Sequence, residues 1–203
     1  MLNRFARAFF TRAFTPLARL FLKLGISPDV VTIVGTVGVC VGALVLYPRH
    51  EFFWGTIVVV VFAFSDTLDG VMARLSDRST RWGAYLDSTL DRVGDSAIFG
   101  GLVLWYAGDG GELYLAALAL ACLILGSVVS YSKARAEGLG MTANVGIAER
   151  AERLVVVLTA TGLVGLGVPE VLLTVVLALL ALASLITVVQ RMLEVRRQAF
   201  GVA

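Results

Sequence analysis

Histidine and cysteine are scarce in this chain of 203 residues, which contains one histidine and two cysteines. Cys40 and Cys122 both lie in apolar runs, so we interpret them as core residues and expect neither a disulfide framework nor a zinc site. The single histidine, His50, falls in a predicted loop far from the acidic segment described below. Its position argues against a histidine general base in that segment.

Charge is scarce as well, because 16% of the residues are charged whereas 58% are hydrophobic. With a mean hydropathy of +0.87, this composition excludes an ordinary soluble domain and indicates a polytopic membrane protein. Arginines interrupt the first apolar stretch, so no cleavable signal peptide is expected. The sequence shows neither an internal repeat nor a low-complexity linker, and we predict a single domain over residues 1–203.

Apolar stretches long enough to cross a bilayer recur along the chain. About 20 helical residues span the roughly 30 Å hydrocarbon core. The predicted fold is an all-α integral membrane protein, with a six-helix bundle over residues 30–195. Its transmembrane helices are predicted at residues 30–48, 52–75, 83–107, 113–137, 150–168 and 170–195.

The N-terminal segment differs from these stretches. Residues 3–24 mix regularly spaced Arg and Lys with Phe and Leu, a pattern typical of an amphipathic helix that lies in the headgroup plane. Ser27, Pro28 and Asp29 then mark the start of the next helix. An interfacial helix is therefore predicted to precede the six transmembrane helices.

Lys and Arg fall on one side of the predicted spans, with Arg49 as the single exception. The positive-inside rule makes that side cytoplasmic and places both termini there. We expect a multi-pass protein of the cell membrane whose acidic segment lies in the cytoplasmic half, near the headgroups. Such a site suits a water-soluble substrate that reacts with a lipid.

Four aspartates lie in the short segment 66–91, which apolar runs flank on both sides. Asp66 and Asp69 are spaced i,i+3 and Asp87 and Asp91 are spaced i,i+4, so each pair occupies one helix face. A turn near residues 76–82 would make the two helices antiparallel neighbours with facing carboxylates. Two such charges about 4 Å apart repel by about 4 kcal/mol at an effective dielectric of 20.

This repulsion calls for a compensating cation, and ionisable residues inside membrane spans mark functional sites by default. Ligand sets made only of oxygen suit Mg²⁺, Mn²⁺ or Ca²⁺ rather than zinc. Helix capping by aspartate explains the helical spacing poorly. The segment is therefore predicted to be a metal site.

Glycines in two places bear on helix packing and on the predicted metal site. Gly35, Gly38 and Gly42 line one side of the first predicted span, and small residues there predict close helix packing. Gly70 lies beside a predicted metal ligand. Close packing and room for a substrate are both open interpretations of Gly70.

The string Asp66-x2-Asp69-Gly70-x2-Ala73-Arg74-x8-Gly83-x3-Asp87-x3-Asp91 resembles the signature of the CDP-alcohol phosphotransferase family. Eight residues match at fixed spacing. Further segments look like the phosphatidylinositol phosphate synthases of that family, and the resemblance covers most of the chain. These segments are residues 15–19, 28–32, 130–137, 149–154 and 189–191.

The resemblance implies a reaction in which an alcohol attacks the β-phosphorus of CDP-diacylglycerol and releases CMP. It implies that two Mg²⁺ or Mn²⁺ ions neutralise the diphosphate, with Asp91 also acting as the base. The implied metal ligands are Asp66, Asp69, Asp87 and Asp91. The implied contacts to CDP-diacylglycerol are Asp29, Val30, Val31, Thr32, Gly70, Arg74 and Thr80.

Basic residues near the cytoplasmic ends of three spans predict an anion pocket, although membrane orientation alone would also place them there. With the resemblance, we interpret the pocket as the site of inositol 1-phosphate. Its predicted residues are Lys133, Arg135, Arg153 and Arg191.

Other hypotheses remain open at this point. Glycerol 3-phosphate is the alternative acceptor because it is also anionic, whereas free inositol or serine would leave the basic residues without a purpose. A divalent-cation transporter is a hypothesis of another class, but it gives no reason for the Gly70 to Arg74 part of the signature. The family resemblance implies a homodimer among membrane lipids, and no nucleic-acid partner is expected.

Overall fold

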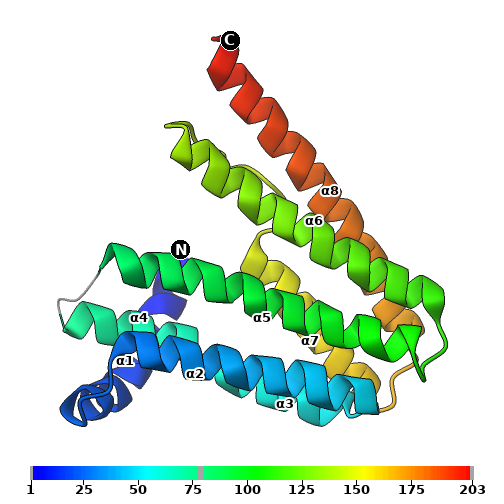
Figure 1. The fold of residues 1–203 in the computed structure, drawn as a ribbon, viewed down its shortest axis with the longest axis horizontal. Coiled ribbons are helices and arrows are strands. Elements are labelled where there is room, and N and C mark those ends of the chain that lie inside the picture. Colours follow the sequence, from blue (N-terminus) through cyan, green and yellow to red (C-terminus); the bar gives the residue numbers. More distant parts are fainter. Residues whose placement is uncertain (1, 77–79, 202–203) are drawn as a thin grey trace.

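The computed structural model describes residues 2–76 and 80–201, and within these ranges the chain forms helices and no strand (Figure 1). The α-helices are α1 (Leu2–Lys23), α2 (Pro28–Val41), α3 (Phe52–Ala63), α4 (Ser65–Leu75), α5 (Arg81–Ala107), α6 (Leu113–Gly138), α7 (Arg150–Gly165) and α8 (Val171–Phe200). The π-helical segment η1 (Gly42–Leu46) and the 3₁₀ turn η2 (Tyr47–Arg49) continue α2.

Helices occupy all six ranges predicted as spans, with two differences in detail. The range 30–48 is completed by η1 and η2, and the range 52–75 divides at Phe64 into α3 and α4. Phe64 has φ −66° and ψ −14°, close to 3₁₀ geometry, so the helix tightens there. Residues 77–79 of the predicted turn lie outside the described residues.

Four helical segments are long and apolar enough to cross a membrane. Helix α7 is shorter, with 16 residues, and α5 carries charged residues through its N-terminal half. The described chain is therefore all-helical with four candidate membrane-spanning segments. These are Pro28–Arg49, Phe52–Leu75, Leu113–Gly138 and Val171–Phe200.

Local capping fixes where three helices begin. The amide of Val30 donates to the Ser27 hydroxyl at the start of α2, and the amide of Gly83 donates to Thr80 Oγ1, 2.9 Å away, at the start of α5. Helix α7 begins with a reciprocal capping box between Glu149 and Glu152. Each cap satisfies amides that have no partner within the helix.

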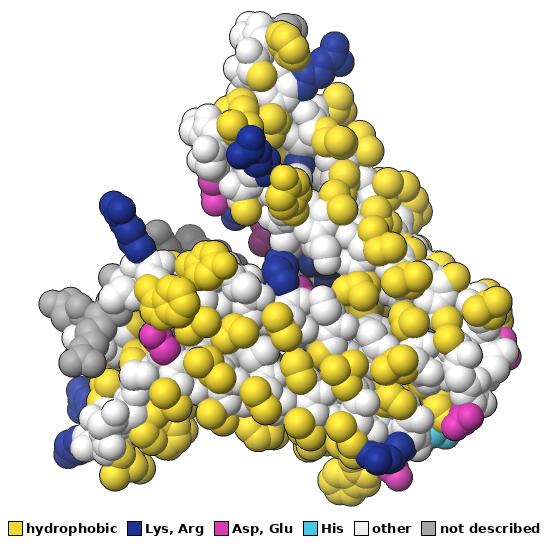
Figure 2. All heavy atoms as spheres, in the orientation of Figure 1, with side chains coloured by type: hydrophobic (Ala, Val, Ile, Leu, Met, Phe, Trp, Pro, Cys, Tyr) yellow, Lys and Arg dark blue, Asp and Glu magenta, His cyan; other side chains and the backbone are white. Residues whose placement is uncertain are grey.

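Helix α5 lies at the centre of the bundle, with α2 on one side and α6 on the other. Helix α3 packs on α7, and α1 packs on α4. Figure 1 shows α6 and α8 running together away from the other helices toward the C-terminus. Hydrophobic side chains are spread over the visible face, while charged ones gather at its ends and in the hollow beside α5 (Figure 2).

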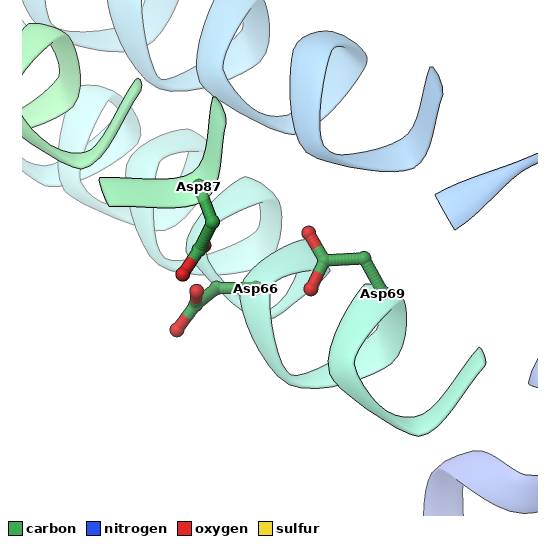
Figure 3. Close-up of side chains that lie close together, drawn as sticks. All are labelled: Asp66, Asp69 and Asp87. Carbon is green, nitrogen blue, oxygen red and sulfur yellow. The ribbon is translucent and has the colours of Figure 1, made fainter. Parts of the chain in front are cut away.

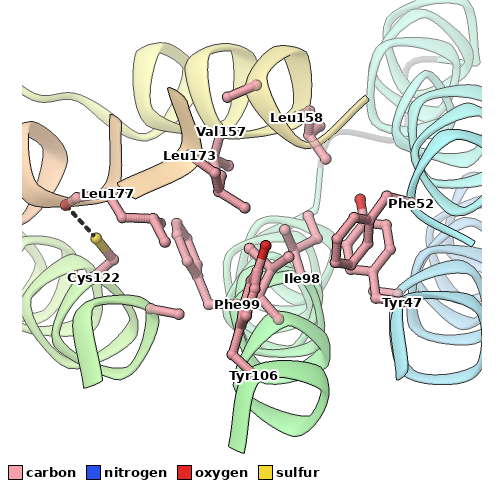
Figure 4. Close-up of a cluster of buried hydrophobic side chains, with 14 of the residues drawn as sticks. Tyr47, Phe52, Ile98, Phe99, Tyr106, Cys122, Val157, Leu158, Leu173 and Leu177 are labelled. Carbon is pink, nitrogen blue, oxygen red and sulfur yellow. Dashed lines mark hydrogen bonds between the residues drawn. The ribbon is translucent and has the colours of Figure 1, made fainter. Parts of the chain in front are cut away.

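Two apolar clusters hold this arrangement. The larger cluster joins α3, α5, α6, α7 and α8 around fully buried side chains such as Phe52, Leu173 and Leu177 (Figure 4). The smaller cluster packs α4 against α1 and α2. It buries the face of α4 opposite the aspartates and so fixes the direction in which they point. Its buried members are Ala18, Val31, Leu68, Val71 and Met72.

The segment between α6 and α7 has no regular structure, but hydrogen bonds attach it to α8. Thr187 Oγ1 accepts from the amides of Ile147 and Ala148, each 3.2 Å away. Arg191 Nε donates to the carbonyl of Val145 at 3.0 Å. The start of α7 is thereby positioned by α8.

Glycines allow the helices to approach closely, as predicted for the first span. A Cβ added to Gly35 would lie 1.6 Å from Ser65 Oγ, so that prediction is confirmed. A close contact with backbone is at Gly101 of α5, where a Cβ would lie 2.3 Å from the carbonyl oxygen of Ala43. The neighbouring Gly100 has space, with its nearest atom at 3.8 Å.

We expect Gly101→Ala to destabilise the protein by about 1–3 kcal/mol, because backbone must move to admit the methyl group. The control Gly100→Ala, on the same helix, should be neutral or slightly stabilising because alanine favours the helix. Thermal unfolding in detergent, followed by circular dichroism, measures both variants. Equal melting temperatures for the two variants would contradict the close approach of α5 and η1.

Candidate functional site

Three carboxylates converge where α4 faces α5. Asp66 and Asp69 project from α4 and Asp87 projects from α5, with their carboxylates turned toward one another (Figure 3). One oxygen from each lies within 4.8 Å of the others. Asp69 is buried, with 7% of its surface exposed, whereas Asp66 is exposed. We call these three residues the acidic cluster.

The acidic cluster is also tied to α2. The Thr32 hydroxyl lies 3.1 Å from the carbonyl of Pro28 and also contacts Asp69 Oδ2, the stronger acceptor. One hydrogen bond does not offset the mutual repulsion of three carboxylates. Three converging oxygens form a donor set that fits Mg²⁺ or Mn²⁺, so the described residues match the predicted type of cofactor.

Asp91, one turn beyond Asp87, has a different partner. Its Oδ1 lies 2.8 Å from Arg150 Nη2, and its Oδ2 lies 3.8 Å from Arg92 Nη2. The structure therefore brings together three of the four predicted metal ligands and pairs the fourth with arginine. The guanidinium attracts the carboxylate, whereas the other aspartates repel it.

A cavity of about 1170 Å³ adjoins the acidic cluster, and we call it the large cavity. Asp66, Asp87 and Asp91 line it together with apolar side chains of α2, α3, α5 and α7. Along α7 its lining runs from Arg150 to Leu166, which corresponds to about 24 Å of helix. The cavity thus changes from charged to apolar along α7, as an amphipathic ligand requires.

The residues predicted to contact the lipid donor are divided between cavity and surroundings. Thr32, Gly70 and Arg74 line the large cavity. A Cβ on Gly70 would meet only Arg74 Nη1, at 3.5 Å, which favours the interpretation that Gly70 leaves room for a ligand. The other four predicted residues do not line it: Val31 is in the apolar core, Thr80 caps α5, Val30 is exposed, and Asp29 approaches Gly83.

A second cavity, of about 330 Å³, lies between α5, α6, α7 and α8, and we call it the small cavity. Its lining is strongly charged, with four cations and three carboxylates. The cations are Arg92, Lys133, Arg150 and Arg191, and the carboxylates are Asp91, Glu137 and Glu149.

Lys133 and Arg191 are thus where the sequence predicted an anion pocket. Arg191 is 4% exposed, and two of its guanidinium nitrogens donate to the carbonyls of Val129 and Val145. These bonds fix the plane of the guanidinium at the cavity wall. A fixed guanidinium is well suited to bind an anion.

The other two predicted pocket residues lie elsewhere. Arg153 is 2% exposed and donates to the carbonyls of Ala148 and Gly126, so it joins α6 to α7 and lines neither cavity. Arg135 is exposed on α6 and does not line the small cavity. Whether either residue contacts a substrate stays a prediction.

Sequence reasoning missed Arg92 and Arg150 as lining residues. Arg92 follows a predicted ligand directly and is spaced i,i+3 from Asp95, with which it forms an ion pair at 3.3 Å. This i,i+3 spacing on a helix predicts the ion pair from the sequence. Arg150 gave no such signal, because its carboxylate partners are on α5, far away in sequence.

Solved structures resemble this fold closely. Phosphatidylinositol phosphate synthase from Mycobacterium tuberculosis with CDP-DAG bound has a TM-score of 0.87 at 45% identity, covering 91% of this chain and 94% of that one. The same enzyme in complex with manganese and citrate has a TM-score of 0.84 at 45% identity, covering 90% and 88%.

Curated relatives carry the same name. The phosphatidylinositol phosphate synthase of Streptomyces avermitilis is 57% identical, over 98% of this chain and 84% of the relative. That of Cutibacterium acnes is 47% identical, over 97% and 98%. The sequence model for CDP-alcohol phosphatidyltransferase matches residues 25–189. The chain therefore belongs to the CDP-alcohol phosphatidyltransferase family.

Proposed function

We propose that this membrane enzyme transfers the phosphatidyl group of CDP-diacylglycerol to inositol 1-phosphate, giving phosphatidylinositol phosphate and CMP. The observation that carries the proposal is the junction of two unlike cavities. The large cavity combines carboxylates with an apolar lining, the small cavity is basic, and both reach Asp91. The names of the relatives and the CDP-DAG bound by the Mycobacterium tuberculosis enzyme support this function.

The large cavity suits the lipid donor. In this proposal the nucleotide lies near Gly70 and Arg74, and the acyl chains follow the apolar lining toward Leu166. Arg74 is exposed and its guanidinium approaches Gly70, where it can donate to a phosphate or to cytosine. The segment from Asp29 to Thr32 would act at the edge of this site, where Thr32 meets Asp69.

The acidic cluster, with Asp91 beside it, would hold divalent ions such as Mg²⁺ or Mn²⁺, two in number by family resemblance. Bound there, the ions neutralise the diphosphate and stabilise the negative charge of the leaving CMP. Manganese in the solved Mycobacterium tuberculosis structure supports this cofactor.

Asp91 is proposed as the base, because it lies where the two cavities meet. It would take the proton of the inositol hydroxyl as that oxygen bonds to the β-phosphorus. The bond from the β-phosphorus to the bridging oxygen breaks, and the electron pair leaves with CMP. The carboxylate of Asp91 would therefore accept the proton close to the place where the acceptor oxygen attacks the phosphorus.

The small cavity is proposed to bind the phosphate of the acceptor through Lys133 and Arg191. Arg153 would support them by holding α7 against α6, and Arg135 would attract the anion from outside. Glycerol 3-phosphate would satisfy the same charges, but the named relatives favour inositol phosphate. The anionic acceptor also explains why cations outnumber carboxylates in this cavity.

We further propose a single domain with six transmembrane helices and α1 lying in the headgroup plane. The position of Lys and Arg on one side supports a cytoplasmic active site and cytoplasmic termini in the cell membrane. Helix α1 packs on α4, so an interfacial α1 would place the acidic cluster near the headgroups. A homodimer is proposed on family resemblance alone.

The acceptor is tested by CMP release from the purified protein in detergent with CDP-diacylglycerol and Mg²⁺ or Mn²⁺. Inositol 1-phosphate should give the highest kcat/KM, by about tenfold or more over glycerol 3-phosphate and free inositol, since only it fills the basic cavity with a phosphorylated ring. Preference for glycerol 3-phosphate would keep the chemistry and overturn the acceptor. Without CMP release for any acceptor, the proposed function is wrong.

Metal binding is tested without turnover. Asp69→Asn and Asp87→Asn should each weaken Mn²⁺ binding by more than about tenfold, a loss seen even for residues that only support a ligand. Electron paramagnetic resonance of free Mn²⁺ measures the dissociation constant. Asp109→Asn, an exposed residue between α5 and α6, is the control and should bind normally. Unchanged binding in both cluster variants would exclude the acidic cluster as the metal site.

Arg191→Gln should raise the KM for inositol 1-phosphate by about tenfold or more, because a charged hydrogen bond to the phosphate is lost. The KM for CDP-diacylglycerol should stay within about twofold. The control Arg197→Gln lies on the same helix and is exposed. Within the described part of the chain, Arg197 pairs with Glu194 and lines neither cavity. An unchanged acceptor KM in Arg191→Gln would show that this arginine does not bind the acceptor and serves only to hold the segment between α6 and α7.

A further inference from the structure

Among the residues that the structure describes, Asp91 and Arg150 line both cavities, and they form an ion pair with each other. Arg150 Nη2 lies 2.8 Å from Asp91 Oδ1, while Arg150 Nε donates to Asp95 Oδ1 at 3.0 Å. An ion pair thus lies where the large cavity and the small cavity meet. Asp95 lines neither cavity.

Contacts at the backbone and at the guanidinium group both fix the position of Arg150. Its backbone begins α7, where the capping box of Glu149 and Glu152 fixes the helix start. Its guanidinium spans Asp91 and Asp95, which are spaced i,i+4 on one face of α5. Asp95 is held in turn by Arg92, whose Nη2 lies 3.3 Å from Asp95 Oδ2.

A planar fork with several donors is needed for this geometry. Arginine can contact two carboxylates at once, whereas lysine carries its charge at a single point. The side chains are well shielded, because Arg150 is 31% exposed, Asp91 is 21% exposed and Asp95 is 11% exposed. Their interaction is therefore screened less by solvent than a surface pair would be.

We propose that Arg150 is a positioning residue, which Asp95 anchors so that it holds Asp91 at the junction of the two cavities. It has a second effect on the same site. Its positive charge lies beside the carboxylates that bind the metal and opposes metal binding. The catalytic part rests on the proposed function, and the electrostatic part rests only on the proposed metal site.

Removing Arg150 should therefore change two properties in opposite directions. In Arg150→Met, Asp91 loses its orientation and kcat should fall by about 30-fold or more, part of the roughly 100-fold to 10,000-fold that a positioned acid–base group contributes. The loss of a neighbouring positive charge should tighten Mn²⁺ binding by about threefold or more. A residue with only a structural role would weaken both properties together.

Lysine separates charge from geometry. Arg150→Lys should bind Mn²⁺ with nearly the wild-type dissociation constant, because the charge remains. Its kcat should still be about tenfold low, because an ammonium cannot contact Asp91 and Asp95 as a fork does. Wild-type kcat in Arg150→Lys would show that charge alone suffices and would overturn the positioning role.

Asp95 tests whether the anchor acts through Arg150. Asp95→Asn alone should lower kcat by about threefold to tenfold. In the Arg150→Met background the same change should have no further effect, because coupled residues are not additive. Additive losses would show that Asp95 acts independently and would contradict the proposed chain of contacts.

The experiment uses the full-length protein in detergent, with Mn²⁺ titrated by electron paramagnetic resonance and CMP release measured with inositol 1-phosphate. Arg197→Met is the control, an exposed arginine with a carboxylate partner at 2.9 Å, and it should match wild type in both assays. An unchanged kcat with a raised acceptor KM in Arg150→Met would make Arg150 an acceptor ligand and overturn the proposal.

The two assays also separate the proposals. If wild type binds Mn²⁺ but releases no CMP, the proposed function fails, while tighter Mn²⁺ binding by Arg150→Met still supports the electrostatic part. If wild type turns over and Arg150→Met has wild-type kcat and Mn²⁺ affinity, the function stands and the Arg150 proposal fails.

Discussion

Repulsion between carboxylates is the constraint on which the arrangement of this protein depends. Asp66, Asp69 and Asp87 hold oxygens within 4.8 Å of one another, and that closeness persists only if the helices that carry them cannot separate. The apolar cluster of α1, α2 and α4 fixes one side. The glycine contact of α5 with Ala43 fixes the other. Packing therefore keeps the like charges together and leaves a set of oxygens that could hold a divalent cation.

One turn further along α5, an opposite charge compensates the repulsion between carboxylates. There Asp91 meets Arg150 instead of other carboxylates, and the two cavities meet at this pair. The proposed substrates share anionic phosphate but differ in their apolar part, and the two cavities differ in the same way. Two cavities that share Asp91 and Arg150 would let each substrate keep its own surroundings while the reacting atoms approach.

The sequence predicted the helices and the convergence of Asp66, Asp69 and Asp87 well, for physical reasons. Long apolar runs are local signals, and i,i+3 or i,i+4 spacing of aspartates reports a shared helix face directly. It did not predict the division at Phe64, where neither proline nor glycine signals a break. It also did not predict that Arg150 lines both cavities, whereas contact of Arg153 with a substrate stays a prediction. Both begin α7, and only the packing of α7 against α5 and α6 decides which one faces the cavities.

The attachment of the α6–α7 segment to α8 has a consequence for how the protein is made. Thr187 and Arg191 hold the segment that leads into α7, yet they are synthesised after it. The acidic cluster is complete once α5 has emerged, whereas the basic cavity has to wait for the last helix. During synthesis from the N-terminus, the nascent chain therefore acquires its acidic cluster first and the α8 side of its small cavity last. An unfinished chain lacks the wall that Arg191 provides to the small cavity.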